Sequence, residues 1–194
     1  MIIELKKQKD TDSRGRKNST VNDVFSAVSF VIRARGKDEV RPILTYMVVE
    51  SDNDGKKTLA CTDGRRLHFS NPIENLNFEP GLYRILKATP SLVWLDYLPP
   101  SPLIGTYPSW RQVVPTNATC ETEVTYSQAS GEFALCVDIH KATGAFFNLP
   151  YVIDCFPVGK YAKVIIAVEP AKDGLNAAII RHEQGTAVLM SMHH

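Results

Sequence analysis

The chain has 194 residues, of which 44% are hydrophobic and 22% are charged, and its formal net charge is +1. This composition predicts a globular protein of one or two domains with a substantial core, and the balanced charge excludes a strongly basic, histone-like protein. The charge is unevenly spread, however. Residues 1–41 carry ten Lys or Arg and six Asp or Glu, whereas residues 42–194 carry twelve and fifteen. The first part of the chain is therefore the candidate for contact with an anionic partner.

Membrane and metal signals are missing from the sequence. The first residues lack the apolar run of a signal peptide, and no stretch approaches the roughly 18 apolar residues of a membrane span. We therefore expect a cytoplasmic protein with no membrane partner. Cys61, Cys120, Cys136 and Cys155 form no CxxC pair, so we expect buried, reduced thiols and no metal site. No catalytic or cofactor-binding motif is recognisable, and we expect a non-enzymatic protein with no cofactor.

Hydrophobic spacing predicts the elements of the first part of the chain. Residues 1–9 alternate weakly as a strand, and apolar residues from Val21 to Ile32 recur with helical spacing. Asp54-Gly55 predicts a hairpin turn between two strands. The predicted strands that follow the helix are residues 43–50, 58–62 and 67–70. The order over residues 1–73 is therefore β-α-β-β-β.

The rest of the chain predicts more strands and a short helix. An extended, proline-bounded segment is predicted at residues 107–115. Asn148 can cap a short helix that has Pro150 in its first turn. The predicted strands are residues 81–88, 92–98, 121–126, 133–139, 145–147, 164–168, 175–181 and 186–192. The last four of these strands and the short helix repeat the β-α-β-β-β order.

The two repeats predict an α+β fold of two β-α-β-β-β units with antiparallel sheets and one helix each. The expected units are residues 1–115 and residues 116–194. The alternative is one domain over residues 1–194 in which residues 74–140 are an insertion.

Four segments resemble, in the same order, parts of the bacterial DNA polymerase III beta sliding clamp family. Arg41-Pro42-Ile43-Leu44 and then Thr62-Asp63-Gly64-Arg65-Arg66-Leu67 resemble the family's middle domain. The segment YPSWRQVVP at residues 107–115 resembles the connection between its second and third domains. FNLPYVID at residues 147–154 and the chain end, residues 188–194, resemble its third domain. The family's first domain has no counterpart here, and the resemblance implies a DNA clamp-like fold.

The resemblance implies a peptide-binding site. In the family, a hydrophobic pocket at this junction captures short peptides of DNA polymerases and of the clamp loader. The residues that would form it here are Thr62, Gly64, Arg65, Arg66, Leu67, Pro108, Gln112, Val113, Val188, Met190, Ser191 and Met192. Arg65, Gln112 and Ser191 differ from the residues common in the family, which affects the expected peptide preference more than the pocket itself. Hydrophobic spacing alone would place the Leu, Val and Met residues in the core.

The resemblance also implies contact with duplex DNA. Clamps line their central hole with basic helices that contact phosphates without reading the sequence. The candidates are Arg14, Arg16, Lys17, Arg33, Arg35 and Lys37. Basic residues near the end of a helix also complement the helix dipole, which is the alternative interpretation.

We therefore expect a sliding-clamp-like processivity factor that tethers replication or repair proteins to duplex DNA. It would form a homo-oligomeric ring by pairing of sheet edges, a trimer if each chain has two domains. The alternative is a monomeric adaptor or decoy that binds clamp-binding peptides without encircling DNA. In an enzyme, Asp63 would be the acid beside a motif, but we expect it to be a turn residue.

Overall fold

The computed structural model describes residues 1–8, 19–37, 40–102, 104–116, 120–127, 137, 139–141, 144–156, 161–170 and 176–192. Within these ranges, only the backbone is described for residues 19–22, 120–127, 161–170 and 176. Three of the predicted DNA contacts, Arg14, Arg16 and Lys17, lie outside the described residues.

Ten strands form one antiparallel sheet. The strands are β1 (Ile2–Lys6), β2 (Tyr46–Ser51), β3 (Lys57–Thr62), β4 (Arg66–Phe69), β5 (Gly81–Thr89), β6 (Leu92–Leu98), β7 (Cys120–Ser127), β8 (Tyr161–Pro170), β9 (Asn176–His182) and β10 (Gly185–Met190). Their order across the sheet is β1-β6-β5-β2-β3-β4-β10-β9-β8-β7. The α+β class with antiparallel strands is confirmed.

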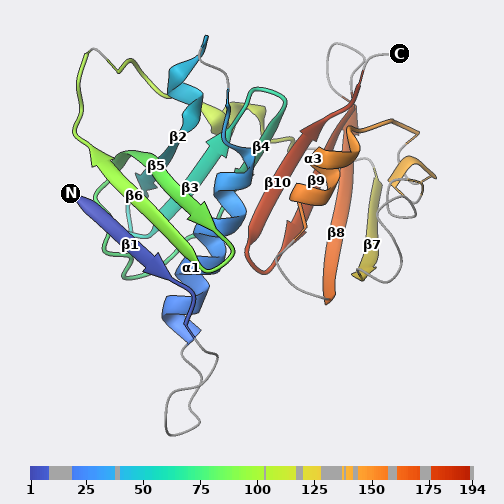
Figure 1. Ribbon diagram of the computed structural model, residues 1–194. Coiled ribbons are helices and arrows are strands. Elements are labelled where there is room, and N and C mark those ends of the chain that lie inside the picture. Colours follow the sequence, from blue (N-terminus) through green and yellow to red (C-terminus); the bar gives the residue numbers. More distant parts are fainter. Residues whose placement is uncertain are drawn as a thin grey trace, which may run out of the picture.

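The sheet is continuous because β4 pairs with β10 at its centre. These two strands are distant in the sequence, yet Leu67 and Val188 are direct register partners. Figure 1 shows the strands of the first part of the chain on one side of this pair and β7, β8 and β9 on the other. The pairing therefore joins the six strands of residues 1–98 to the four strands of residues 120–190 in one sheet.

Two helices cover one face of the sheet. Helix α1 (Ser19–Val31) continues into the 3₁₀ turn η1 (Ile32–Ala34), and its Phe25, Val28 and Val31 are buried. Helix α3 (Leu149–Asp154) begins at the Asn148 cap, whose side-chain oxygen accepts a hydrogen bond from Tyr151 N, as the sequence predicts. Both helices pack into the larger hydrophobic cluster together with residues of β3, β9 and β10.

A smaller cluster lies on the opposite face. Because side chains alternate between the two faces of a strand, Val188 lies on this face while its neighbours Ala187 and Leu189 pack against the helices. Trp110 of the 3₁₀ turn η3 (Trp110–Val113) covers this cluster, next to Leu67 and Val188. The second face is thus closed by an irregular segment instead of a helix.

Four local predictions are wrong. The strand predicted at residues 133–139 is one of them, because residues 137 and 139–141 are helical, while residues 133–136 and 138 lie outside the described residues. Residues 43–45 belong to the 3₁₀ turn η2 (Pro42–Thr45), because Pro42 begins a turn instead of a strand. Residues 110–113 are also a 3₁₀ turn, which lets Trp110 reach the sheet. Residues 145–147 are not a strand, since β7 occupies the sheet position beside β8, while Ala145 and Phe147 are buried in the larger cluster. In the described part of the chain, no helix is long and apolar enough to cross a membrane.

Candidate functional site

A groove of about 400 Å³ lies where β3, β4 and β10 run side by side. The structure brings fourteen residues to its walls: Arg41, Ile43, Leu44, Thr62, Gly64, Arg65, Arg66, Leu67, Pro108, Ser109, Trp110, Val113, Val188 and Met190. Most of these side chains are apolar. Three are arginines, and no acidic residue is among them. The groove therefore combines an apolar floor with a cationic side.

Strand register explains why distant segments meet here. Thr62 of β3 pairs with Leu67 of β4, and Leu67 pairs with Val188 of β10. Register partners in neighbouring strands have their side chains on the same face, with Cβ atoms about 5 Å apart. Met190 follows Val188 by two positions and lies on the same face. The three strands thus supply a continuous apolar row.

The β3–β4 turn is held by its own side chains. Asp63 Oδ1 accepts hydrogen bonds from the backbone N–H groups of Arg65 and Arg66, at 2.9 and 3.1 Å. Thr62 Oγ1 accepts one from Gly64 N at 3.0 Å. Gly64 has a φ of +87°, a conformation that side-chain-bearing residues rarely adopt. Asp63 is therefore a turn residue, as predicted.

Side-chain contacts hold the η3 segment and the residues before it against the sheet. The hydroxyl of Tyr107 accepts a hydrogen bond from Thr62 N at 3.1 Å, and burial raises the pKa of this phenol, so it stays protonated. The Trp110 ring lies 5.0 Å from the Phe69 ring and is 3% exposed. Arg111 lies over the Trp110 ring at 4.3 Å and forms an ion pair with Glu50 at 3.0 Å. This wall is therefore preformed.

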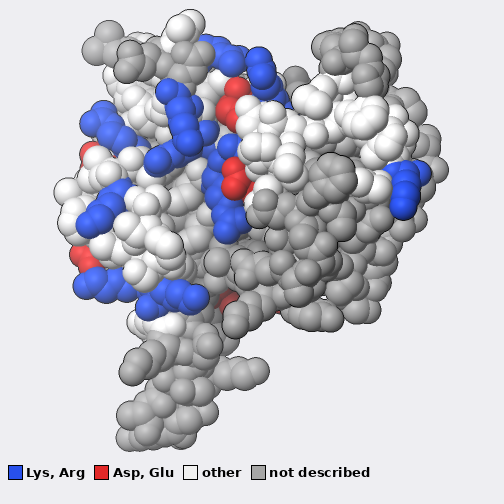
Figure 2. Space-filling model, turned by 45° about the vertical axis from the view of Figure 1, so that its right-hand side comes forward, with Lys and Arg blue, Asp and Glu red and all other residues white. Residues whose placement is uncertain are grey.

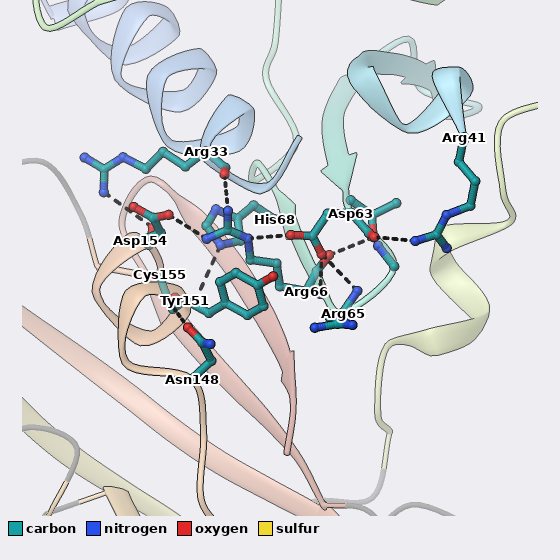
Figure 3. Close-up of polar contacts among 12 residues, drawn as sticks. Arg33, Arg41, Asp63, Arg65, Arg66, His68, Asn148, Tyr151, Asp154 and Cys155 are labelled. Carbon is teal, nitrogen blue, oxygen red and sulfur yellow. Dashed lines mark hydrogen bonds and ion pairs between the residues drawn. The ribbon is translucent and has the colours of Figure 1, made fainter. Parts of the chain in front are cut away.

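Behind the groove, Arg66 connects three elements (Figure 3). Its guanidinium donates to Asp63 Oδ2 at 3.1 Å, to Asp154 Oδ2 at 2.5 Å and to the carbonyl of Arg33 at 2.7 Å. It also lies over the Tyr151 ring at 4.3 Å. The side chain is 7% exposed, so these contacts replace water almost completely. Arg66 thereby fixes α3 and η1 against β4.

Next to Arg66, a histidine and a cysteine are sealed in the core. His68 Nδ1 donates to the Phe30 carbonyl at 3.0 Å, and its Nε2 lies 3.5 Å from Cys155 Sγ. Burial lowers the pKa of His68 to about 3 and raises that of the Cys155 thiol. Both groups are therefore neutral at pH 7, and both are fully buried. A neutral, solvent-excluded pair has no access to a substrate, so we assign it a packing role.

A second cavity of about 430 Å³ lies on the helix-covered side and is basic. Its charged residues are Lys7, Arg33, Arg35, Lys37, Arg66 and Asp154. Burial lowers the pKa of Arg33, while the nearby Asp154 raises it, and Arg33 donates to the Phe156 carbonyl at 2.8 Å. Figure 2 shows Lys and Arg side chains gathered over one half of the face drawn there. Lys7 thus lines the same cavity as the three predicted DNA contacts that the structure describes, which are Arg33, Arg35 and Lys37.

Nine of the twelve predicted pocket residues line the groove, and Gln112, Ser191 and Met192 do not. Gln112 is exposed on η3. Strand β10 ends at Met190, after which Met192 N donates to the Phe146 carbonyl at 2.9 Å and leads the chain away from the groove. For these three residues a role in peptide binding stays a prediction.

Five lining residues were missed: Arg41, Ile43, Leu44, Ser109 and Trp110. All five belong to segments that carry the family resemblance. The sequence signal that could have identified them is their place in the segments at residues 41–44 and 107–115. Arg41 Nη2 donates to the Asp63 carbonyl at 3.3 Å, so the first of these segments contacts the β3–β4 turn.

Solved bacterial sliding clamps share this fold. DNA polymerase III subunit beta from Borrelia burgdorferi, in complex with a natural product, matches with a TM-score of 0.58 and 13% identity over 100% of this chain and 64% of that chain. The DNA polymerase sliding clamp from Pseudomonas aeruginosa gives 0.57 and 13% over 100% and 67%, and that from Bacillus subtilis gives 0.56 and 13% over 100% and 64%.

The chain therefore has a sliding-clamp fold and spans about 64% of the length of the Borrelia and Bacillus clamps. No protein-family model and no curated protein matches it. At 13% identity the structural likeness establishes the fold alone, so function has to be argued from the groove and the basic cavity.

Proposed function

We propose that this chain is a non-enzymatic, sliding-clamp-like processivity factor. It would tether replication or repair proteins to duplex DNA in the cytoplasm by holding short peptides of those proteins in the groove at the β4–β10 junction. One observation carries the proposal: on a clamp fold, four separate segments of the chain converge on a preformed groove with an apolar floor.

The groove suits peptide side chains of the Leu and Phe type. Leu67, Val188 and Met190 offer an apolar surface, and a Met side chain adapts to differently shaped partners. Phe69 and Arg111 both contact the Trp110 ring. The Trp110 side chain therefore loses little conformational entropy when a peptide packs against this wall. The expected partners are peptides of a DNA polymerase or of a clamp loader.

Lys and Arg side chains of the basic cavity are the proposed contacts with DNA phosphates. Lys7, Arg35 and Lys37 form no ion pair with a carboxylate among the described residues, so their charges are available to phosphates. Such contacts are electrostatic and do not depend on base sequence. Arg33 and Arg66 hold backbone carbonyls and carboxylates and are proposed to support this surface without direct phosphate contact.

We further propose that the chain consists of two clamp-like units, residues 1–115 and residues 116–194, and that three copies close a ring. Strands β1 and β7 are the two edges of the described sheet. Pairing of β1 in one copy with β7 in the next would extend the sheet and remove both edges.

The test combines oligomeric state with retention on DNA. Light scattering after size exclusion should give a trimer, and the protein should remain on circular DNA but leave it after linearisation. Binding to short duplex DNA should weaken steeply with salt, and replacing Arg35 and Lys37 by Gln should reduce the salt dependence. Lys56→Gln is the matched control, since Lys56 pairs with Glu74 at 2.7 Å away from the cavity. A monomer with no DNA retention would contradict the clamp proposal.

A second candidate is an adaptor that binds clamp-binding peptides without encircling DNA. The formal net charge of only +1 favours it, because long-range attraction to DNA is weak. Peptide binding by a monomer that shows no DNA retention would support this candidate.

A further inference from the structure

Two of the three arginines that line the groove have no carboxylate partner among the described residues. Arg66 is neutralised by Asp63 and Asp154. Arg41, in contrast, donates only to the carbonyl of Asp63, at 3.3 Å, and Arg65 is exposed on the turn with no ion pair. The groove wall therefore carries two uncompensated positive charges beside an apolar floor.

The β3–β4 turn positions both charges. Figure 3 shows the side chains of Arg41 and Arg65 on either side of Asp63. The Arg41 guanidinium lies against Gly64, where an added Cβ would meet Arg41 Nη1 at 2.9 Å. Because Gly64 has no side chain, the Arg41 guanidinium can lie in this space.

Asp63 does not cancel these charges. Its carboxylate accepts from the backbone N–H groups of Arg65 and Arg66 and from Arg66 Nε, so it is already engaged. A carboxylate brought by a ligand would therefore find two available guanidinium groups, which bind carboxylates by charge-assisted and often bidentate hydrogen bonds.

We infer that the groove selects peptides that carry a carboxylate next to their apolar residues, through Arg41 and Arg65. The inference rests on the proposed peptide-binding function and names the chemistry of its ligand. The carboxylate can come from an acidic side chain or from the C-terminus of the peptide. In both cases the apolar residues pack on Leu67 and Val188 while the acid lies at the β3–β4 turn.

The experiment compares peptides that share Leu and Phe but differ in charge. Gln-Leu-Ser-Leu-Phe is prepared with an amidated and with a free C-terminus, and Asp or Asn replaces each non-apolar position or is appended to either end. Binding is followed by Trp110 fluorescence in a Trp94→Phe background. For at least one Asp position, or for the free C-terminus, we expect binding about fivefold tighter than for the neutral counterpart at low salt, and a smaller difference at 0.5 M salt.

Variants assign the effect to the two arginines. Arg41→Gln and Arg65→Gln should each reduce the ratio of the affinities for the acidic and the neutral peptide, and the double variant should abolish this preference. Arg111→Gln is the control, because Arg111 lies near the groove but is paired with Glu50, and it should keep the preference. Equal affinity for acidic and neutral peptides at every position would overturn the inference while leaving the peptide groove intact. Failure of all the peptides to bind would instead overturn the proposed function.

Discussion

Arg66 of β4 and Asp154 of α3 form an ion pair at 2.5 Å although they are 88 residues apart in the sequence. Arg66 lines both the groove and the basic cavity, and Asp154 lines the basic cavity. One side chain therefore separates the two surfaces proposed to contact peptide and DNA, and it also fastens α3 to the sheet.

We expect Arg66→Ala to lower the free energy of unfolding by about 3 kcal/mol, because it leaves Asp63 and Asp154 without their partner in a partly buried place. Urea denaturation followed by circular dichroism measures the change. Arg111→Ala removes an exposed ion pair with Glu50 and should cost no more than about 1 kcal/mol. Similar losses in the two variants would show that the Arg66 network is not a major source of stability.

Met190 and Met192 provide a matched pair for the groove. Met190 lines it, whereas Met192 is 48% exposed and lies outside its lining. Met190→Ala should therefore raise the Kd for Gln-Leu-Ser-Leu-Phe by about tenfold, the loss of a moderate contact residue. Met192→Ala should raise the Kd by less than Met190→Ala does. Calorimetry gives both values, and an opposite ranking would move the binding surface toward the chain end.

Gly185, the first residue of β10, is packed too tightly for a side chain. An added Cβ would lie 2.2 Å from the Phe69 carbonyl oxygen, and the residue has a φ of +152°. Gly185→Ala should therefore disturb the β4–β10 pairing and cost about 3 kcal/mol or more. Gly105 also has a positive φ, of +81°, but no atom within 4 Å of an added Cβ. Gly105→Ala should cost about 1 kcal/mol. Thermal denaturation of both variants distinguishes the cost of the steric clash from that of backbone strain. Equal losses of stability in the two variants would argue against a tight contact at Gly185.

The buried histidines predict acid sensitivity. Burial lowers the pKa of His68 to about 3 and that of His182 to about 4. The unfolded chain, with a His pKa of about 6.5, then binds more protons than the folded chain. Stability is therefore complete above pH 6.5 and falls as the pH decreases toward 4, by on the order of 2 kcal/mol per histidine at pH 5.

Urea denaturation at pH 7.5 and pH 5 tests this expectation. His68→Gln should lower stability at pH 7.5, since it removes a buried ring, but should also reduce the loss between the two pH values. A wild-type protein that is equally stable at both pH values would contradict the assignment of neutral, buried histidines.

The sequence determined much of the local structure and most of the groove residues. Alternating and helical spacing places β6, α1 and α3 correctly, because each buries an apolar face that leaves its period in the sequence. The groove residues Thr62, Leu67 and Val188 were predicted through the family resemblance, which marks separate segments that come together. Periodicity alone could not distinguish them from core residues, since both are apolar.

Only the tertiary structure decided how these segments meet. The pairing of β4 with β10 is a long-range contact that no local pattern encodes, and it places Leu67 beside Val188. The segments at Pro42 and Trp110 were predicted as extended but form 3₁₀ turns. Pro42 begins the first turn, and in the second turn Trp110 packs into the smaller cluster on the sheet. The charge of Arg41 and Arg65 was visible in the sequence, but their lack of carboxylate partners depends on Asp63 being engaged by Arg66 and the turn backbone.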